Sequence, residues 1–171
     1  MNTSRFSIRR ILFLLIAATG CGGLSGIPSA ADQAPINLYF MDATRTYLKA
    51  EVRQIPESES PTAFARAVLE ALLEGPREGL ARAIPKGLAL RAAFVTGEKT
   101  AYVDFAKNPE TFAETSVLFE WLAVYSIVNS LILNLPEVET VKILMEGREV
   151  QTFSGHVDLT GSFKANMLLV R

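Results

Sequence analysis

The sequence offers very little thiol or imidazole chemistry. Its 171 residues include a single cysteine and a single histidine. One cysteine cannot close an internal disulfide, and one histidine without a second cysteine leaves too few nitrogen and sulfur ligands for a zinc site. Gly-rich phosphate-binding loops and the G-x-S-x-G nucleophile motif are also missing. We therefore expect no metal, no cofactor and no enzymatic activity.

The chain also lacks a cluster of basic residues. Lys and Arg number 17 against 18 Asp and Glu, and three of the arginines fall in residues 1–20, where no acid occurs. The rest of the chain is therefore mildly acidic, whereas nucleic-acid binding requires a basic patch that contacts phosphates. This composition excludes nucleic acid as an expected partner.

Residues 1–20 have the organisation of an export signal. Arg5, Arg9 and Arg10 precede a short apolar run at 11–18, ILFLLIAA, and small residues follow it. A helix of that length reaches only about 12 Å, well short of a bilayer's hydrocarbon core. The run therefore targets the chain for export without spanning the membrane, and the arginine pair leaves a twin-arginine route open.

Cys21 directly follows this signal in the sequence ATGCGG. Small residues before a cysteine resemble a bacterial lipobox, in which the cysteine is lipidated and becomes the N-terminus; Ala18 stands where Leu is usual. Cleavage at Ser29-Ala30-Ala31 is the alternative, and it would remove Cys21 together with the signal. We expect a lipidated Cys21 to anchor the exported protein in the lipid bilayer, because two or more acyl chains anchor stably. The protein would lie on the extracytoplasmic side, in the periplasm or at the outer membrane where the host has two membranes.

Composition divides the remaining chain into a tether, one domain and a tail. Residues 21–35 are rich in Gly, Pro, Ser and Ala without a hydrophobic period, which indicates a flexible tether. Residues 36–162 form the predicted domain. Residues 163–171 form a tail whose Met-Leu-Leu-Val cluster indicates packing against the domain or against another copy.

Hydrophobic patterning predicts two strand hairpins, two helices and a final strand. The strands are expected at 36–40, 46–55, 88–95, 100–105 and about 138–146. In the second strand, Leu48 and Val52 are the apolar residues among polar neighbours. The first helix begins at Ser60-Pro61 and ends at Gly75-Pro76, which are favoured start and stop residues.

The second helix, from about residue 115 to 133, is apolar nearly all round. It fits either a membrane span or a helix buried in a domain core. Glu120 and Asn129 would be costly in lipid, which favours the core helix. Asn129 would then need hydrogen-bond partners, most simply the backbone of a loop.

Six short segments between residues 36 and 162 are informative when they are taken together and in order. They are LYF, EALLEGP, LARAIPKG, AYVDF, YSIVNSLILNLPEVETVKILMEGREV and GHVDL. Together they resemble the GerMN domain family of sporulation and germination proteins and bacterial lipoproteins. The resemblance implies an α+β fold in which two helices pack on one face of a mixed, mostly antiparallel sheet, similar to the ring-building motifs of secretion systems. It also implies non-catalytic assembly of envelope complexes, with an envelope protein or a second copy as partner.

The best enzymatic candidate is the segment Ser154-Gly155-His156-Val157-Asp158, which holds the only histidine. Nucleophilic catalysis would require the hydroxyl on a strained turn within hydrogen-bond reach of the imidazole. Proximity in sequence does not provide this geometry. We expect instead that His156 ties a C-terminal loop down by hydrogen bonds.

The alternative function is that of a lipoprotein that binds a small ligand or peptidoglycan. Its pocket would lie between the sheet and the C-terminal loop, near Tyr125, Asn129 and His156, with Asp158 as a further contact. A ligand site requires a concave, largely apolar cavity with convergent polar groups. The same four residues are the candidate contacts for a protein partner.

Overall fold

The elements of the domain follow the predicted order. The computed structural model describes residues 33–107 and 116–171. Its elements are β1 (Gln33–Met41), β2 (Leu48–Pro56), α1 (Pro61–Glu74), β3 (Leu88–Val95), β4 (Thr100–Lys107), α2 (Val117–Ile132), β5 (Thr140–Met145) and a short 3₁₀ helix, η2 (Met167–Leu169). The two helices and mostly antiparallel strands confirm the α+β class.

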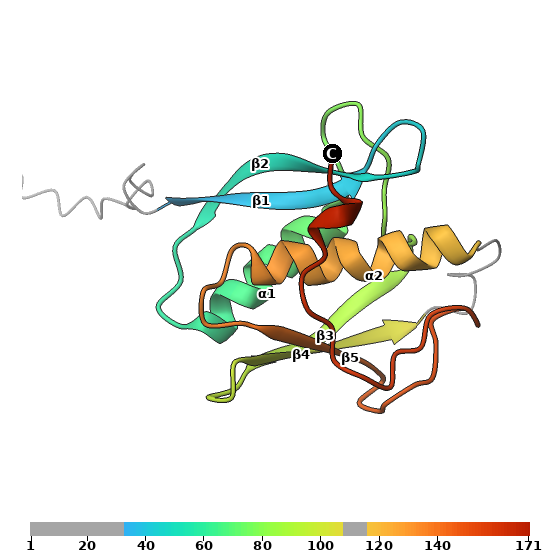
Figure 1. Cartoon of the computed structure of the whole chain (residues 1–171). Coiled ribbons are helices and arrows are strands. Elements are labelled where there is room, and N and C mark those ends of the chain that lie inside the picture. The colour runs from blue at the N-terminus through green and yellow to red at the C-terminus, as the bar shows by residue number, and fades with distance from the viewer. Residues whose placement is uncertain (1–32, 108–115) are drawn as a thin grey trace, which may run out of the picture.

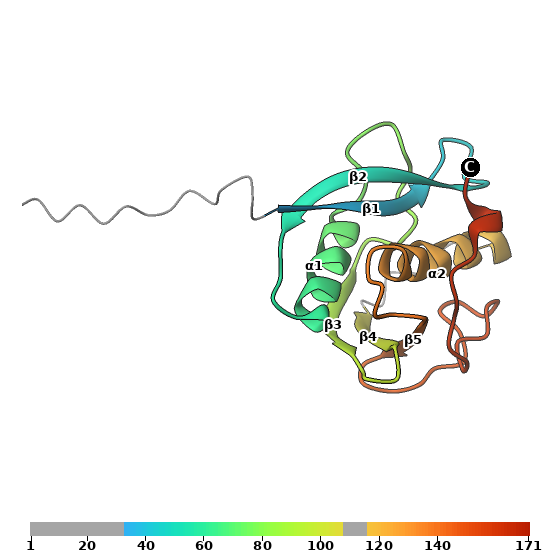
Figure 2. The same ribbon diagram turned by 60° about the vertical axis from the view of Figure 1, so that its left-hand side comes forward.

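Helices α1 and α2 lie side by side between two separate sheets (Figure 1). β1 and β2 form an antiparallel hairpin, while β3, β4 and β5 form a sheet with one antiparallel and one parallel pairing. The hairpin covers the helices on one side and the three-stranded sheet covers them on the other (Figure 2). The expectation of a single sheet therefore fits only the three-stranded layer, because the hairpin packs across the helices without joining it.

Helix α1 begins and ends at the predicted residues. Ser60 is its N-cap, with Oγ 3.2 Å from the N–H of Ala63, and Pro61 occupies the first turn. Gly75 follows the helix with φ of 91°, a conformation that favours glycine. A Cβ at Gly75 would also collide with the guanidinium of Arg82. Ser60, Pro61 and Gly75 therefore determine where α1 begins and ends.

Helix α2 is the central element of the core. Every residue from Leu122 to Leu131 is buried, and Ser116 caps its N-terminus through the N–H of Phe119. The core-helix prediction is confirmed. Across residues 33–107 and 116–171, neither helix combines the length and apolar character that crossing a bilayer requires.

Polar side chains near the C-terminal end of α2 satisfy the backbone of β1 along the edge that faces away from β2. Ser130 Oγ accepts from the N–H of Tyr39 at 3.0 Å, and Ser126 Oγ donates to the Tyr39 carbonyl at 2.6 Å. Asn134 bonds both the N–H and the carbonyl of Asn37, at 2.9 and 2.8 Å. The four-residue spacing places the three side chains on one side of the helix and of the turn that follows it. The helix thus covers this edge in place of another strand.

Ser130→Ala removes the acceptor of the buried Tyr39 N–H. We expect the free energy of unfolding to fall by about 1–2 kcal/mol, since a buried donor without an acceptor costs about 1–3 kcal/mol. Urea titration followed by circular dichroism measures the change. Ser162→Ala, at an exposed serine, is the matched control and should stay within about 0.5 kcal/mol of the parent. Equal losses in the two variants would contradict the role of the Ser130 hydroxyl.

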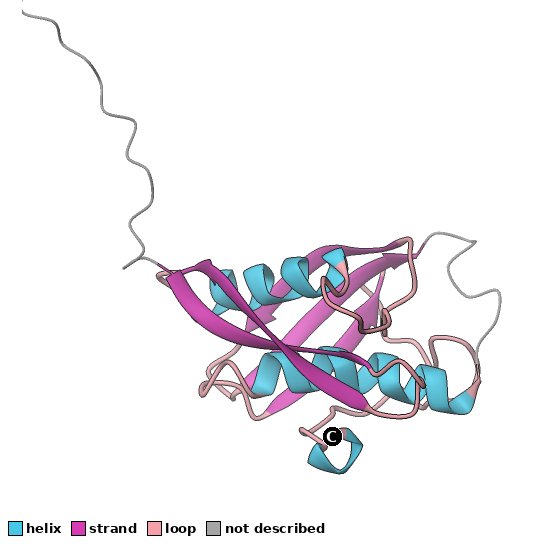
Figure 3. Cartoon of the chain, turned by 90° about the horizontal axis from the view of Figure 1, so that it is seen from above, coloured by secondary structure: helices cyan, strands magenta, loops and turns pink. Residues whose placement is uncertain are grey.

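The chain after β5 runs back over the domain and ends beside the hairpin (Figure 3). Phe163 exchanges two backbone hydrogen bonds of 2.8 Å with Val141 of β5. The N–H of Arg171 donates to the carbonyl of Leu48 at 3.0 Å. The tail therefore packs against its own domain, although the side chain of Leu168 is exposed.

Candidate functional site

A buried carboxylate on α2 holds the loop that contains the histidine. Glu120 lies in the first turn of the helix and is 1% exposed. Its Oε1 accepts from the N–H groups of Phe153 and Ser154 at 2.9 and 3.0 Å. Its Oε2 accepts from the N–H of His156 at 2.9 Å and lies 3.0 Å from the Nδ1 of the same residue. His156 therefore ties down a C-terminal loop, as predicted.

The surroundings of Glu120 favour its charged form. Burial by itself raises the pKa of this carboxyl, but hydrogen bonds from the N–H groups of Ser154, His156 and Val157 outweigh burial and hold the pKa below its ordinary value. The N-terminal end of α2 also favours a negative charge. A general acid or base needs a pKa near the working pH. Glu120 is therefore suited to anchoring the loop and not to moving protons.

The serine, histidine and aspartate of the 154–158 segment do not form a catalytic unit. Ser154 Oγ is buried and has no hydrogen-bond partner within the described residues, so it does not bond the imidazole of His156. Asp158 accepts from Oγ1 and the N–H of Thr160, at 2.7 and 2.9 Å, and these bonds lower the pKa of Asp158. The hydrogen bond between nucleophile and base that activates a serine is missing from this segment.

Asn129 and Tyr125 hold the C-terminal tail. Asn129 Nδ2 donates to the carbonyl of Asn166 at 3.1 Å, and Asn129 Oδ1 accepts from the Asn166 N–H at 2.9 Å. The predicted loop-backbone partner is thereby confirmed. The ring of Tyr125 packs edge-on against Trp121 and Phe163, with centroids 4.9 and 6.0 Å apart. Burial raises the pKa of the Tyr125 hydroxyl.

The four predicted contact residues thus serve two separate segments. Tyr125 and Asn129 meet the tail, whereas His156 meets the first turn of α2 and Asp158 lies in an exposed turn. Within the described residues, no hydrogen bond joins the first pair to the second. Cys21, the predicted site of lipid attachment, lies outside the described residues.

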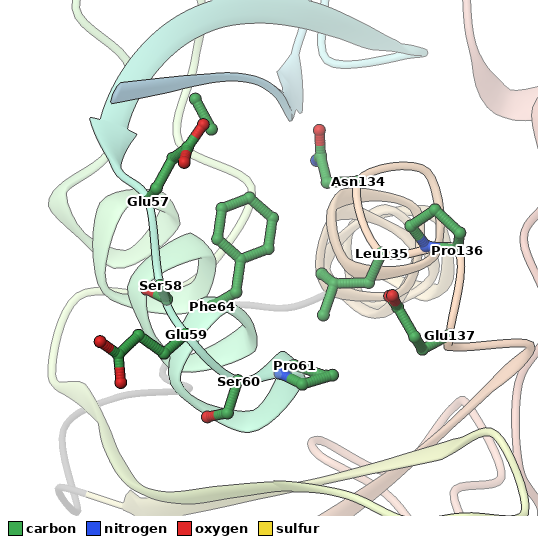
Figure 4. A pocket seen from close by; sticks show the side chains of 11 residues that line it. Glu57, Ser58, Glu59, Ser60, Pro61, Phe64, Asn134, Leu135, Pro136 and Glu137 are labelled. Atoms are coloured by element: carbon green, nitrogen blue, oxygen red, sulfur yellow. The ribbon is translucent and has the colours of Figure 1, made fainter. Parts of the chain in front are cut away.

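Two cavities lie where α1 begins. One of 350 Å³ lies between the residues before α1 and those after α2, with Phe64 and Leu135 among its lining residues and Glu57 and Glu137 beside it (Figure 4). Another of 410 Å³ adjoins the turn between β3 and β4. Neither is lined by any of the four predicted contact residues. No group of three His, Cys, Asp or Glu side chains in residues 33–107 and 116–171 is placed to hold a metal ion.

A third cavity, of 560 Å³, runs beside β2 and is lined by residues 49–53 together with Arg77, Glu78 and Leu80. We call it the β2 groove. Two of its lining side chains, Glu51 and Arg53, form an ion pair at 2.6 Å, and they are only 9% and 2% exposed.

The ion pair joins β2 to the end of α1. Arg53 donates to the carbonyls of Ala71 and Gly75, which a helix C-terminus leaves without intrahelical partners. Glu51 Oε2 accepts from the N–H of Arg77 at 2.9 Å. Burial raises the pKa of Glu51, but the Arg77 N–H and the Arg53 guanidinium outweigh it and lower that pKa. The pair therefore fixes the loop that forms the far wall of the groove.

Sequence reasoning missed this pair because the strand buries its charged side. The alternation in residues 46–55 groups Val52 with Leu48 as the apolar face. In the structure Val52 is 67% exposed, while Glu51 and Arg53 point inward. The two charges lie two residues apart and therefore share a strand face. That spacing was the available signal.

Comparison with known proteins gives a family and a fold. The family model for Germane, described as sporulation and spore germination, matches residues 37–151. The fold resembles the tandem GerMN domains of the sporulation protein GerM from Bacillus subtilis, with a TM-score of 0.61 and 20% identity over 77% of this chain and 46% of that one. The first GerMN domain of the same protein gives 0.56 and 19% over 77% and 97%.

A candidate lipoprotein from Clostridium perfringens is also similar, with a TM-score of 0.55 and 19% identity over 82% of this chain and 93% of that one. Comparison with curated protein sequences gives no significant match. The descriptions of these three solved structures mention no enzymatic activity. At these identities the structural likeness concerns the fold alone.

Proposed function

This chain belongs to the Germane family, and from that premise we propose that it is a lipid-anchored envelope protein whose domain binds other proteins without catalysing a reaction. The proposal rests on the observation that the polar side chains of α2 are hydrogen-bonded within the domain. Glu120 and Asn129 both bind backbone groups of the chain itself, and His156 binds Glu120. The residues best suited to chemistry are thereby engaged in holding the fold. Binding through surface contacts is the function that such a domain supports best.

Anchoring through Cys21 is supported by the small residues around it and by the short apolar run before it. The structurally similar protein from Clostridium perfringens is described as a candidate lipoprotein. Because β1 already begins at Gln33, the predicted tether is limited to residues 21–32, which would act as a coil with a root-mean-square span of about 20 Å. Such a tether holds the domain near the extracytoplasmic surface of a membrane and leaves its orientation free.

Cys21→Ser is expected to move the protein from the membrane fraction to the soluble fraction, because the acylated thiol is lost. Ultracentrifugation of lysates with immunoblotting measures the partition, and mass spectrometry of the parent should show a mature chain that begins with acylated Cys21. Ser25→Ala in the tether is the matched control and should leave both results unchanged. A mature chain that begins after Ala31, or an unchanged partition in Cys21→Ser, contradicts the anchor.

Protein binding is tested by mild cross-linking in the native membrane, followed by recovery of the full-length chain beside Cys21→Ser. Recovery of envelope proteins or of self-oligomers that depends on Cys21 supports an anchored interaction module. A monomer from both forms, with no recovered protein, contradicts it. Identification of the recovered proteins would also name the process that the domain serves.

A further inference from the structure

The structure closes most of its exposed sheet edges with its own residues. Along the outer edge of β1, Ser126 and Ser130 of α2 bond Tyr39, and Asn134, just after the helix, bonds Asn37. Ala81 exchanges hydrogen bonds of 3.0 and 2.8 Å with Met41. Along the outer edge of β5, Phe163 likewise exchanges two backbone hydrogen bonds with Val141. Covered edges of this kind prevent pairing with other chains.

The outer edge of β3 is blunted by two local devices. Its pairing with β4 is interrupted by a β-bulge between Leu90 and Ala92. The hydroxyl of Thr62 accepts the outward N–H of Val95 at 3.0 Å. A bulge increases the local twist and disfavours addition of another strand.

The edge of β2 is different, as its register with β1 shows. Asn37 and Tyr39 direct their backbone groups away from β2, because those groups bond to side chains of α2 and of the turn that follows it. Val52 and Ala50 are their partners in the antiparallel register. In such a ladder, two residues opposite each other direct their N–H and carbonyl groups in the same sense: either both residues direct them toward the partner strand, or both direct them away from it. Val52 and Ala50 therefore present their N–H and carbonyl groups outward.

This outward edge is open over three alternate residues. At its start, the Leu48 carbonyl is bonded by Arg171. Beyond it, the outward backbone groups of Ala50, Val52 and Gln54 have no partner anywhere in residues 33–107 and 116–171. Val52, at the centre, is also a large apolar side chain that is 67% exposed. The β2 groove lies alongside this edge.

We propose that this edge pairs with β2 of a second copy, antiparallel about a two-fold axis at Val52, so that the two hairpins join into one sheet. The inference deepens the proposed function, on which it rests, by naming a second copy of the chain as a partner. Each facing pair of residues would exchange both of its N–H···O=C bonds. The exposed Val52 side chains would lie against each other.

The charges on the buried face of β2, although each is bonded within its own chain, also fit this register. With the axis at Val52, Glu51 lies opposite Arg53 of the partner subunit, and Arg53 lies opposite Glu51 of the partner subunit. An axis at Glu51 would oppose two carboxylates, and an axis at Arg53 would oppose two guanidinium groups. Like charges directly opposite each other are destabilising in a sheet. Self-pairing about Val52 is thus the arrangement in which open backbone, apolar contact and charge agree.

Sedimentation equilibrium of the full-length chain in detergent tests the pairing. We expect a dimer that Val52→Lys weakens by about tenfold or more, because it places two like charges opposite each other and removes the apolar contact. Gln54→Pro should weaken it as well, since proline deletes an outward N–H that the fold itself does not use. Phe94→Lys replaces another exposed apolar strand residue, 58% exposed, and should leave the dimer intact.

A cross-link tests the register. Val52→Cys in a Cys21→Ser background should form a disulfide-linked dimer under mild oxidation, because facing residues in a hydrogen-bonded pair have Cα atoms about 5.5 Å apart. Phe94→Cys in the same background should not. A monomer at all concentrations, a dimer insensitive to Val52→Lys and Gln54→Pro, or equal cross-linking of both cysteines overturns the proposal. Envelope proteins recovered from membranes by a monomeric chain would leave the proposed function standing.

Discussion

Replacing Glu120 with alanine is expected to lower the free energy of unfolding by about 3–5 kcal/mol, because several backbone N–H groups of the 153–157 loop lose their buried acceptor. Each buried N–H group that is left without an acceptor costs about 1–3 kcal/mol unless water reaches it. The N–H groups of Phe153, Ser154 and His156 converge on this one carboxylate. The loop should also lose its protection from hydrogen exchange, while the hairpin on the far side of the helices keeps it.

Urea titration followed by the fluorescence of Trp121, the next residue along α2, measures this loss. Glu70→Ala is the matched control, because Glu70 is also a helical glutamate and its ion pair with Arg66, at 2.9 Å, is largely exposed. Exposed pairs of this type contribute about 0.3–0.5 kcal/mol. Similar losses in the two variants would show that Glu120 does not anchor the loop.

The same carboxylate predicts how stability depends on pH. The folded chain holds the pKa of Glu120 below its ordinary value. Its contribution is therefore fully present above the unfolded pKa of about 4.3 and is lost as pH falls through the lower folded value. We expect the stability of Glu120→Gln to fall less steeply below about pH 4 than that of the parent. Parallel profiles for the two proteins would contradict the lowered pKa.

Local signals in the sequence were sufficient for the helices and most strands. Ser60 and Pro61 start α1, and Gly75 ends it, because capping and positive φ depend on residues adjacent in the chain. The continuous apolar pattern of α2 identified a core helix once Glu120 and Asn129 were taken into account. Each of these predictions rests on the preferences of a few neighbouring residues.

The contacts that build the site depend on residues far apart in the chain, and the sequence pattern does not encode them directly. Glu120 and His156 are separated by 36 positions, and Asn129 and Asn166 by 37. The pattern showed that Asn129 needed a partner without showing which one. The pattern likewise did not show that the hairpin and the three-stranded sheet form two separate layers: alternation gives the two faces of a strand, but not the element that covers each face.

Arg53→Ala is expected to be comparably destabilising, at about 3–5 kcal/mol, because it leaves the buried carboxylate of Glu51 without its charged partner. The carbonyls of Ala71 and Gly75 at the end of α1 also lose their donor. The guanidinium lies 5.3 Å from the ring centroid of Phe40, and this contact is lost as well. Chemical denaturation measures the effect, with Arg66→Ala on the exposed side of α1 as the control.

A double-mutant cycle separates the ion pair from packing. Arg53→Met keeps much of the side-chain volume but leaves Glu51 charged, so it should remain strongly destabilising. Combining it with Glu51→Gln should restore part of the loss, since removing both charges avoids an uncompensated buried one. Additive losses would contradict the coupling. Val52, between the two charges, bonds neither of them, so Val52→Lys should change self-association. At concentrations too low for dimerisation, it should leave the free energy of unfolding of the monomer within about 0.5 kcal/mol of the parent. This difference would separate the inward face of β2, which stabilises the fold, from its open edge, which we propose binds a second copy.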